Sequence, residues 1–240
     1  MDFYELLKAP GPVILDGGMG TMLQARGLGL GEHPELAALE HWDWVVDIHR
    51  QYAQAGSQIL CANTFGANRE KLRRTGKTVT EVVPPSIDAA REGAAGNALV
   101  ALDIGPIGQL LEPTGSLRFE EAVNIFKEVV LAGVQAGADL VLIETMTDLQ
   151  ECRAALLAVK ECCSLPVMVT IRGPGQALFG PLPRLRRSGT GGDGGRRYRS
   201  QLLSRSSRDA PSGGGADPVV HSAHRHQTQR RPPRPWRSRL

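Results

Sequence analysis

The sequence predicts an α/β protein in which short parallel strands alternate with helices. Five compact apolar runs occur along its first part, at residues 13–15, 58–62, 98–102, 140–143 and 167–169. Runs this short and this apolar are typical of strands buried on both faces of a parallel sheet. The segments between them carry apolar residues at helical spacing, so we expect five β/α repeats.

The clearest helix is expected over residues 119–136, with Gly137 closing its C-terminus. Its apolar positions recur every three or four residues, at Phe119, Ala122, Val123, Phe126, Val129, Val130 and Val134. The following helix is expected to begin at Thr147 with a capping box completed by Gln150. Its predicted apolar face consists of Leu149, Cys152, Leu156, Val159 and Cys163.

Polar residues gather directly after four of the predicted strands, at residues 16–21, 63–66, 103–106 and 144–145. A parallel sheet of this kind can be open and doubly wound, or it can be the first part of a closed barrel. A ring of polar residues at the C-terminal ends of successive strands is where a barrel builds its active site. The sequence therefore predicts a partial TIM (β/α)8 barrel, about its first five repeats, over residues 1–180.

The residue types in this ring fit an amino acid's head group. Two carboxylates could hold an ammonium group, and backbone N–H groups of a glycine turn could receive a carboxylate. The simpler alternative is that the strand-end Asp caps a turn and that Gly17, Gly18 and Gly20 only permit positive φ. The glycine run is not a G-x-G-x-x-G fingerprint, which disfavours dinucleotide binding.

Four motifs carry a family resemblance: D-G-G-M-G-T at 16–21, A-N-T-F-G-A-N-R at 62–69, D-I-G-P-I-G at 103–108 and L-I-E-T-M-T-D at 142–148. In this order and spacing they resemble the homocysteine S-methyltransferase family, most closely the N-terminal homocysteine-binding barrel of cobalamin-dependent methionine synthase. The resemblance covers about residues 10–170. It implies methyl transfer to homocysteine to form methionine, from methylcobalamin or another donor carried by modules outside this chain.

The resemblance assigns substrate-binding roles to part of the ring. Asp16 and Glu144 match the carboxylates that anchor the amino group, and Asn63 is an expected neighbour. The carboxylate-binding loop corresponds to Gly17, Gly18, Met19, Gly20 and Thr21. No catalytic residue is assigned.

The resemblance also implies zinc, which would bind the homocysteine sulfur as a thiolate. Its cysteine ligands lie in an N-C-S motif and a later Cys pair, which this sequence does not contain. Cys162 and Cys163 are expected instead at the bottom of the barrel, as small buried hydrophobes, so no residue is assigned to metal.

Residues 181–240 have a different composition from the rest. They contain 14 Arg and no Lys or Glu, and their net charge is +11, against −8 for residues 1–180. Back-translation of residues 198–206, read one nucleotide later, allows I-G-V-N-C-S-L-G-P, which contains the missing motif. We therefore expect a frame change near residue 180, a disordered basic tail and a truncated barrel without activity. The same origin argues against a metal tract at His221, His224 and His226.

Charge, hydropathy and residue placement bear on the other functions and on the location of the protein. The alternative function is a non-catalytic half-barrel whose basic tail binds nucleic acid or membranes through charge. An aldolase is disfavoured because no strand-end Lys stands where a Schiff base needs one. Without an export signal or a long apolar run, the expected location is the cytoplasm, with homocysteine as the partner and neither nucleic acid nor membrane.

Overall fold

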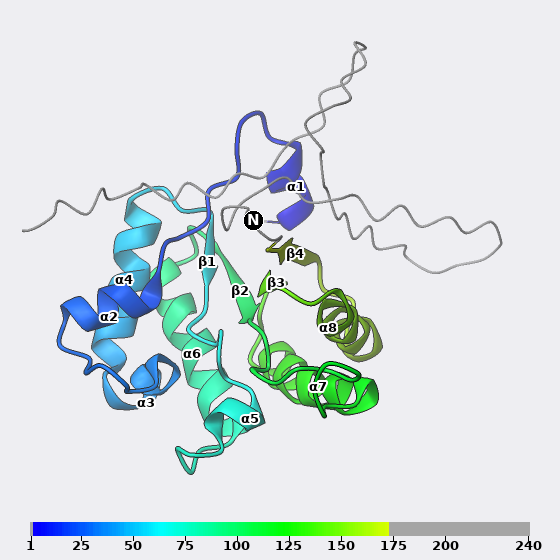
Figure 1. Ribbon diagram of the computed structural model, residues 1–240. Coiled ribbons are helices and arrows are strands. Elements are labelled where there is room, and N and C mark those ends of the chain that lie inside the picture. The colour runs from blue at the N-terminus through cyan, green and yellow to red at the C-terminus, as the bar shows by residue number, and fades with distance from the viewer. Residues whose placement is uncertain (1, 173–240) are drawn as a thin grey trace, which may run out of the picture.

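A computed structural model describes residues 2–172, and its centre is a four-stranded parallel sheet. The strands lie in sequence order, β1-β2-β3-β4, and every neighbouring pair is parallel (Figure 1). They are β1 (Ile59–Cys61), β2 (Leu99–Ile104), β3 (Leu140–Met146) and β4 (Val167–Ile171). Four of the five predicted strands are confirmed. The predicted tail, residues 181–240, lies outside the described residues.

The first predicted strand, residues 13–15, was wrong as a strand. Leu15 forms a single parallel bridge to Ile59. Around it, the Ile14 carbonyl accepts from the backbone N–H groups of Gln58 and Ile59, and the Asp16 N–H donates to the Ile59 carbonyl. The segment therefore lies beside β1 in the expected direction, but it pairs over too short a length to form a strand because Asp16-Gly17-Gly18 turns the chain into the next helix.

Helices connect and cover the strands in β/α order (Figure 1). Before β1 come α1 (Phe3–Lys8), α2 (Met19–Ala25), the 3-10 helix η1 (Pro34–Leu36), α3 (Ala37–Glu40) and α4 (Trp42–Gln54). Between the strands lie α5 (Arg69–Leu72), α6 (Val79–Ala94), α7 (Phe119–Gln135) and α8 (Leu149–Cys162).

Both faces of the sheet are buried, and alternation along the strands assigns each residue to one of them. The outer face packs against α6, α7 and α8 through Leu60, Val100, Leu102, Val141, Ile143 and Val169. The inner face packs against Phe3 and Leu6 of α1 through Ile59, Leu99, Ala101, Leu140 and Leu142. The strands therefore read as continuous apolar runs, and the inner face corresponds to the interior of a barrel.

The α7 prediction is confirmed to within a residue. The helix ends at Gln135, and Gly137 follows with φ 86°. The Gly137 N–H donates to the Val134 carbonyl and the Ala138 N–H donates to the Gly133 carbonyl. Glycine is needed here because a side chain disfavours the left-handed conformation.

The predicted start of α8 was wrong by one residue. The N-cap is Asp148, whose side chain accepts from the Gln150 N–H at 2.8 Å, so no capping box forms at Thr147. Leu149 is the first residue of the helix, 57% of it is exposed, and it does not join the apolar face. Cys152, Leu156 and Val159 are buried as expected, whereas Cys163 is the half-buried C-cap.

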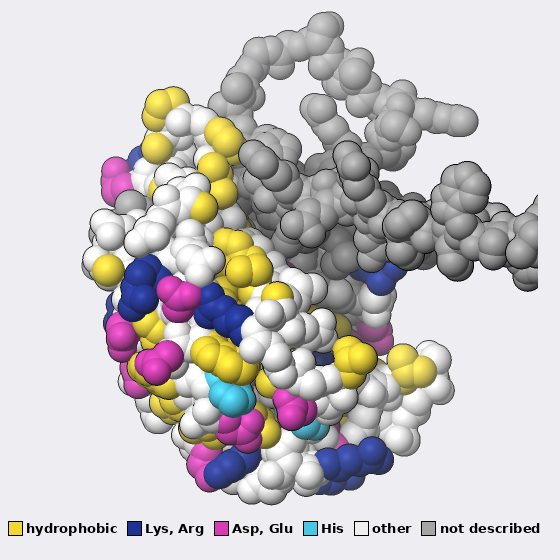
Figure 2. Space-filling view, turned by 90° about the vertical axis from the view of Figure 1, so that its left-hand side faces the viewer, with side chains coloured by type: hydrophobic (Ala, Val, Ile, Leu, Met, Phe, Trp, Pro, Cys, Tyr) yellow, Lys and Arg dark blue, Asp and Glu magenta, His cyan; other side chains and the backbone are white. Residues whose placement is uncertain are grey.

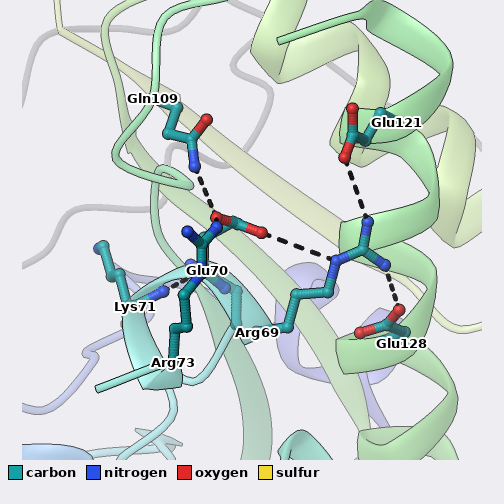
Figure 3. Close-up of polar contacts among 8 residues, drawn as sticks. Arg69, Glu70, Lys71, Arg73, Gln109, Glu121 and Glu128 are labelled. Carbon is teal, nitrogen blue, oxygen red and sulfur yellow. Dashed lines mark hydrogen bonds and ion pairs between the residues drawn. The ribbon is translucent and has the colours of Figure 1, made fainter.

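A polar network fixes the short helix α5 that follows the end of β1 (Figure 3). Glu70 accepts from Gln109 at 2.6 Å and from Arg73, which joins α5 to the loop after β2. Arg69 contacts Glu128 and, at 3.7 Å, Glu121, both on α7. Single surface ion pairs contribute little, but a network that shares two arginines can hold a short helix in place. The helix α5 is thereby tied both to the loop after β2 and to α7.

The protein surface over α2, α3 and α4 mixes charged and apolar side chains. On the face that Figure 2 shows, acidic and basic groups are interspersed, so neither sign dominates it. Within residues 2–172, no helix combines the length and apolar character that crossing a membrane requires.

Near its C-terminal end, β3 bulges. The pairing with β4 shifts between Ile143 and Met146, and Thr145 has φ 59°, a left-handed conformation that is an outlier for a β-branched residue. The Thr145 N–H cannot join the ladder and donates instead to the Thr170 hydroxyl at 2.9 Å. The Thr170 side chain on β4 therefore supplies the acceptor for the backbone N–H that the bulge removes from the ladder.

Replacing Thr170 with Val should destabilise the protein by about 1 to 3 kcal/mol, because the half-buried Thr145 N–H would lose its acceptor while side-chain volume is nearly kept. Urea unfolding would measure this change. Thr147→Val, at an exposed position two residues beyond Thr145, is the matched control and should have little effect. Equal stabilities for the two variants would show that the bulge does not depend on Thr170.

Candidate functional site

Three carboxylates meet at the C-terminal ends of the strands. Asp103 pairs in register with Leu142, and Glu144 lies two residues beyond Leu142 on the same face of β3. Asp16 reaches the end of β1, where its Oδ2 accepts from the Cys61 N–H at 3.0 Å. Each of these carboxylates acts on another, because Glu144 raises the pKa of both Asp16 and Asp103. Figure 1 places these strand ends on the side of the sheet away from α1.

Asp16 is buried at this point, with 3% of its side chain exposed. Burial raises its pKa to about 7, while hydrogen bonds with Cys61 act in the opposite direction. The carboxyl group therefore titrates near neutral pH, far from the ordinary range of an Asp.

His49, on α4, lies behind Asp16. Its Nδ1 is 3.8 Å from Asp16 Oδ2, too far for a hydrogen bond, and neither ring nitrogen has a hydrogen-bond partner among the described residues. The side chain is fully buried, and burial lowers its pKa to about 4. At neutral pH the imidazole is therefore uncharged. A Cβ at Gly93 of α6 would lie 2.5 Å from the His49 Cβ, which shows how closely α4 and α6 pack at this point.

Asp103 is the most deeply placed carboxyl group of the three. Its residue is 7% exposed, and its Oδ1 has no hydrogen-bond partner among the described residues. Burial raises its pKa well above the ordinary value, and the charges of Glu144 and Asp16 add to this effect. Lys71 of α5 acts in the opposite direction.

Glu144 lies nearer the solvent and is half-buried, and burial raises its pKa as well. It stands directly before Thr145, the residue with the strained backbone. Strain of this kind persists where the surroundings overdetermine the conformation, which is common at functional sites.

The turn after Asp16 leads into the first turn of α2. Gly18 is the N-cap and makes no side-chain cap hydrogen bond, Met19 and Gly20 begin the helix, and the Thr21 hydroxyl donates to the Gly18 carbonyl at 3.0 Å. None of Gly17, Gly18 and Gly20 has a positive φ, so the interpretation that they only permit that conformation was wrong. A Cβ at Gly17 would lie 2.7 Å from the Tyr52 hydroxyl, so Gly17 lets the tyrosine ring approach the turn.

Asn63 is buried at the end of β1, and its side-chain amide already forms a hydrogen bond within the protein. Its Nδ2 donates to the Pro34 carbonyl at 2.5 Å and so ties the end of β1 to η1. This geometry gives Asn63 a structural task at the site.

The residues described do not supply the zinc centre that the sequence resemblance implies. Within residues 2–172, no group of three or more His, Cys, Asp or Glu side chains is arranged to hold a metal ion. Burial raises the pKa of the Cys61 thiol well above its usual value, which disfavours the thiolate that a metal needs. Cys162 and Cys163 lie at the end of α8, before β4 begins, and thus at the opposite end of the sheet from the carboxylates.

A parallel β/α sheet with acidic groups at its C-terminal strand ends is the arrangement expected of the first part of a (β/α)8 barrel enzyme. Residues 13–177 match the family described as homocysteine S-methyltransferase, and the chain belongs to this family.

Relatives and solved structures agree with this assignment. The chain is 31% identical to zebrafish (Danio rerio) betaine–homocysteine S-methyltransferase 1 over 186 residues, covering 75% of this chain and 46% of that protein. It is 28% identical to methionine synthase of Mycobacterium tuberculosis over 190 residues, covering 69% of this chain and 16% of the synthase. The metallated homocysteine methyltransferase MmuM of Escherichia coli superposes with a TM-score of 0.63 at 23% identity, covering 69% of this chain and 65% of that one, which shows a shared fold.

Sequence reasoning placed Asp103 in the ring of polar residues but gave it no role, and it did not identify His49. Asp103 stands in a motif at a strand end, and that position was a usable signal. His49 gave none, because it lies within a helix and reaches Asp16 only through the packing of α4 beside β1.

Folding should transfer a proton between His49 and Asp16. Between about pH 4 and 6.5 an unfolded chain carries a charged imidazole and an ionised carboxylate, whereas the folded pair is neutral and holds the same number of protons. The two contributions to the pH dependence of stability should therefore cancel in the wild type.

In single variants, the free energy of unfolding should depend on pH with slopes of opposite sign, each up to about 1.4 kcal/mol per pH unit. Asp16→Asn leaves His49, whose lowered pKa makes stability rise with pH through this window. His49→Gln leaves Asp16, whose raised pKa makes stability fall as pH rises from about 4 to 7. Urea unfolding at several pH values measures both, with the double variant as the reference that should parallel the wild type. Slopes of the same sign in the two single variants would contradict the neutral pair.

Proposed function

We propose that this chain is the homocysteine-binding domain of a methyltransferase that converts homocysteine to methionine. The observation that carries the proposal is the buried acidic cluster at the C-terminal strand ends of a chain in this family. The chain spans about half the length of the curated betaine–homocysteine methyltransferases that it matches, so the activity of a whole enzyme is part of the proposal.

The acidic cluster suits the ammonium group of the substrate. Asp16 and Glu144 are desolvated, and each is destabilised as a charge until a cation arrives. An ammonium group placed between them would gain two charge-assisted hydrogen bonds where little water competes. The substrate carboxylate would face the backbone N–H groups of the turn from Gly17 to Thr21, whose first helical turn has no side-chain cap.

Activation of the thiol is proposed to need residues beyond those described. Zinc would lower the pKa of the homocysteine thiol, but the described residues contain no site for it. We propose that residues 1–180 are the N-terminal part of the barrel and that residues 181–240 are read in a shifted frame, which removes the N-C-S ligand motif. The methyl donor, methylcobalamin or another, would be carried by a further module, and the protein would act in the cytoplasm. The alternative of a nucleic-acid- or membrane-binding tail concerns residues outside the described part of the chain.

Sequencing of the gene and its transcript should find an insertion or deletion of one nucleotide near codon 180. Correction should produce N-C-S-L-G-P, and the corrected chain should then bind zinc, which the 240-residue chain should not hold stoichiometrically. An uninterrupted transcript that ends at Leu240 would refute the frame change.

Asp16→Asn and Glu144→Gln should each weaken L-homocysteine binding to the full chain. Leaving one charge of a desolvated pair uncompensated costs about 2 to 5 kcal/mol, which corresponds to roughly thirtyfold or more in Kd. Titration calorimetry measures the change. Asp88→Asn, an exposed carboxylate on the surface of α6, is the matched control and should bind like the wild type. Unchanged affinity in both site variants would show that these carboxylates only cap turns and do not bind the substrate.

A further inference from the structure

We propose that Asp103 is a third ammonium-binding carboxylate, which together with Asp16 and Glu144 gives a primary ammonium group one acceptor for each of its three N–H groups. This inference rests on the proposed function and assigns a specificity-determining residue to it. Asp103 would discriminate primary amines from amines that lack N–H groups.

The backbone around Asp103 is held without the help of its side chain. The Thr64 hydroxyl accepts from the Asp103 N–H at 3.1 Å and donates to the Asp103 carbonyl at 2.8 Å. Thr64 is itself buried, at 1% exposure. A carboxylate that caps a turn would spend its oxygens on nearby N–H groups, whereas Asp103 Oδ1 has no partner among the described residues. Its function therefore lies outside the local backbone.

The direction of the side chain follows from the strand. Asp103 is two residues beyond Ala101, which packs on the inner face, and it pairs in register with Leu142 of that same face. Glu144 follows Leu142 by two residues, so both carboxylates project from neighbouring strands to one side. Repulsion between the two carboxylates agrees with this placement, since Glu144 is the charged group with the largest effect in raising the pKa of Asp103.

Three desolvated carboxylates in one place cannot all ionise unless a cation joins them, and the charge of Glu35 on η1 also raises the pKa of Asp103. Lys71 is the nearby cation that favours ionisation of Asp103, but its Nζ lies 4.9 Å from the centroid of the Phe65 ring. Within residues 2–172, no ion pair of 4.0 Å or less joins Lys71 to Asp103. A buried polar oxygen without a partner is costly, and a ligand that supplies the missing donor repays that cost.

A primary ammonium group matches this deficit in both charge and hydrogen bonds. It has three donors and no acceptor, as the Lys side chain has. Asp16 Oδ2 already accepts from Cys61, so one acceptor is partly engaged before the ligand arrives. When the ammonium group binds, the cluster ionises, and the protons that its carboxyl groups held pass to the solvent. Ligand binding is therefore coupled to proton release.

The first test is calorimetry of L-homocysteine binding at pH 7 in two buffers of different ionisation enthalpy, which counts the protons released. It compares the full wild-type chain with Asp103→Asn, and uses Asp88→Asn as the control. We expect Asp103→Asn to bind about tenfold more weakly or worse and to release fewer protons. The same affinity and the same proton count as the wild type would overturn the role of Asp103 while leaving the proposed function intact.

The second test needs no homocysteine. Carboxyl carbon NMR of the ¹³C-labelled chain is followed while methylammonium or, as a control without N–H groups, tetramethylammonium is added. Methylammonium should shift the Asp16 and Glu144 signals in the wild type and do so at least severalfold less in Asp103→Asn, whereas tetramethylammonium should shift neither. If homocysteine fails to bind but this pattern holds, the proposed function falls and the ammonium site stands. If both cations act alike, or if the two proteins respond alike, the ammonium site is refuted.

Discussion

Exclusion of water from the strand ends determines the chemistry of this domain. An exposed carboxylate would ionise near pH 4, remain solvated and have no particular affinity for a cation. Below Asp103 and Glu144, the inner face continues with Ala101 and Leu142, and the outer face is covered by helices. Apolar layers therefore lie below the carboxylates and behind them, where a surface residue would have water. Their raised pKa values and their mutual repulsion follow from this placement.

Each carboxylate is held by contacts with a neighbouring strand, so the cluster depends on the sheet as a unit. Asp16 is fixed by the Cys61 N–H of β1, and Asp103 of β2 is bracketed by Thr64, which follows β1. The bulge beside Glu144 is satisfied by Thr170 of β4. A displacement of one strand would therefore move the carboxylate carried by the neighbouring strand. This mutual support allows small strands to hold groups that repel one another.

The sequence was most informative where one residue type had one physical reason to be present. Runs such as 98–102 and 140–143 could be identified as strands because both faces of a parallel sheet exclude water. The start of α8 was missed by one residue because Thr147 and Asp148 can both cap a helix, and local pattern does not rank them. The strand at 13–15 was overestimated, since an apolar run shows burial but not the length of its pairing. His49 was invisible because its contact with Asp16 joins two segments that no periodicity relates.

The helix α1 restricts the direction from which a ligand can reach the carboxylates. Phe3 and Leu6 pack on the inner face of the sheet together with Val13, Ile59 and Leu99, and thereby fill the interior from the N-terminal ends of the strands. The carboxylates stand at the other end. Under the proposed function, homocysteine, the methyl donor and the product methionine would all use the end of the sheet where the carboxylates stand. A donor module that docked there would block departure of the product, so turnover under the proposed function would require the module to move away after each transfer.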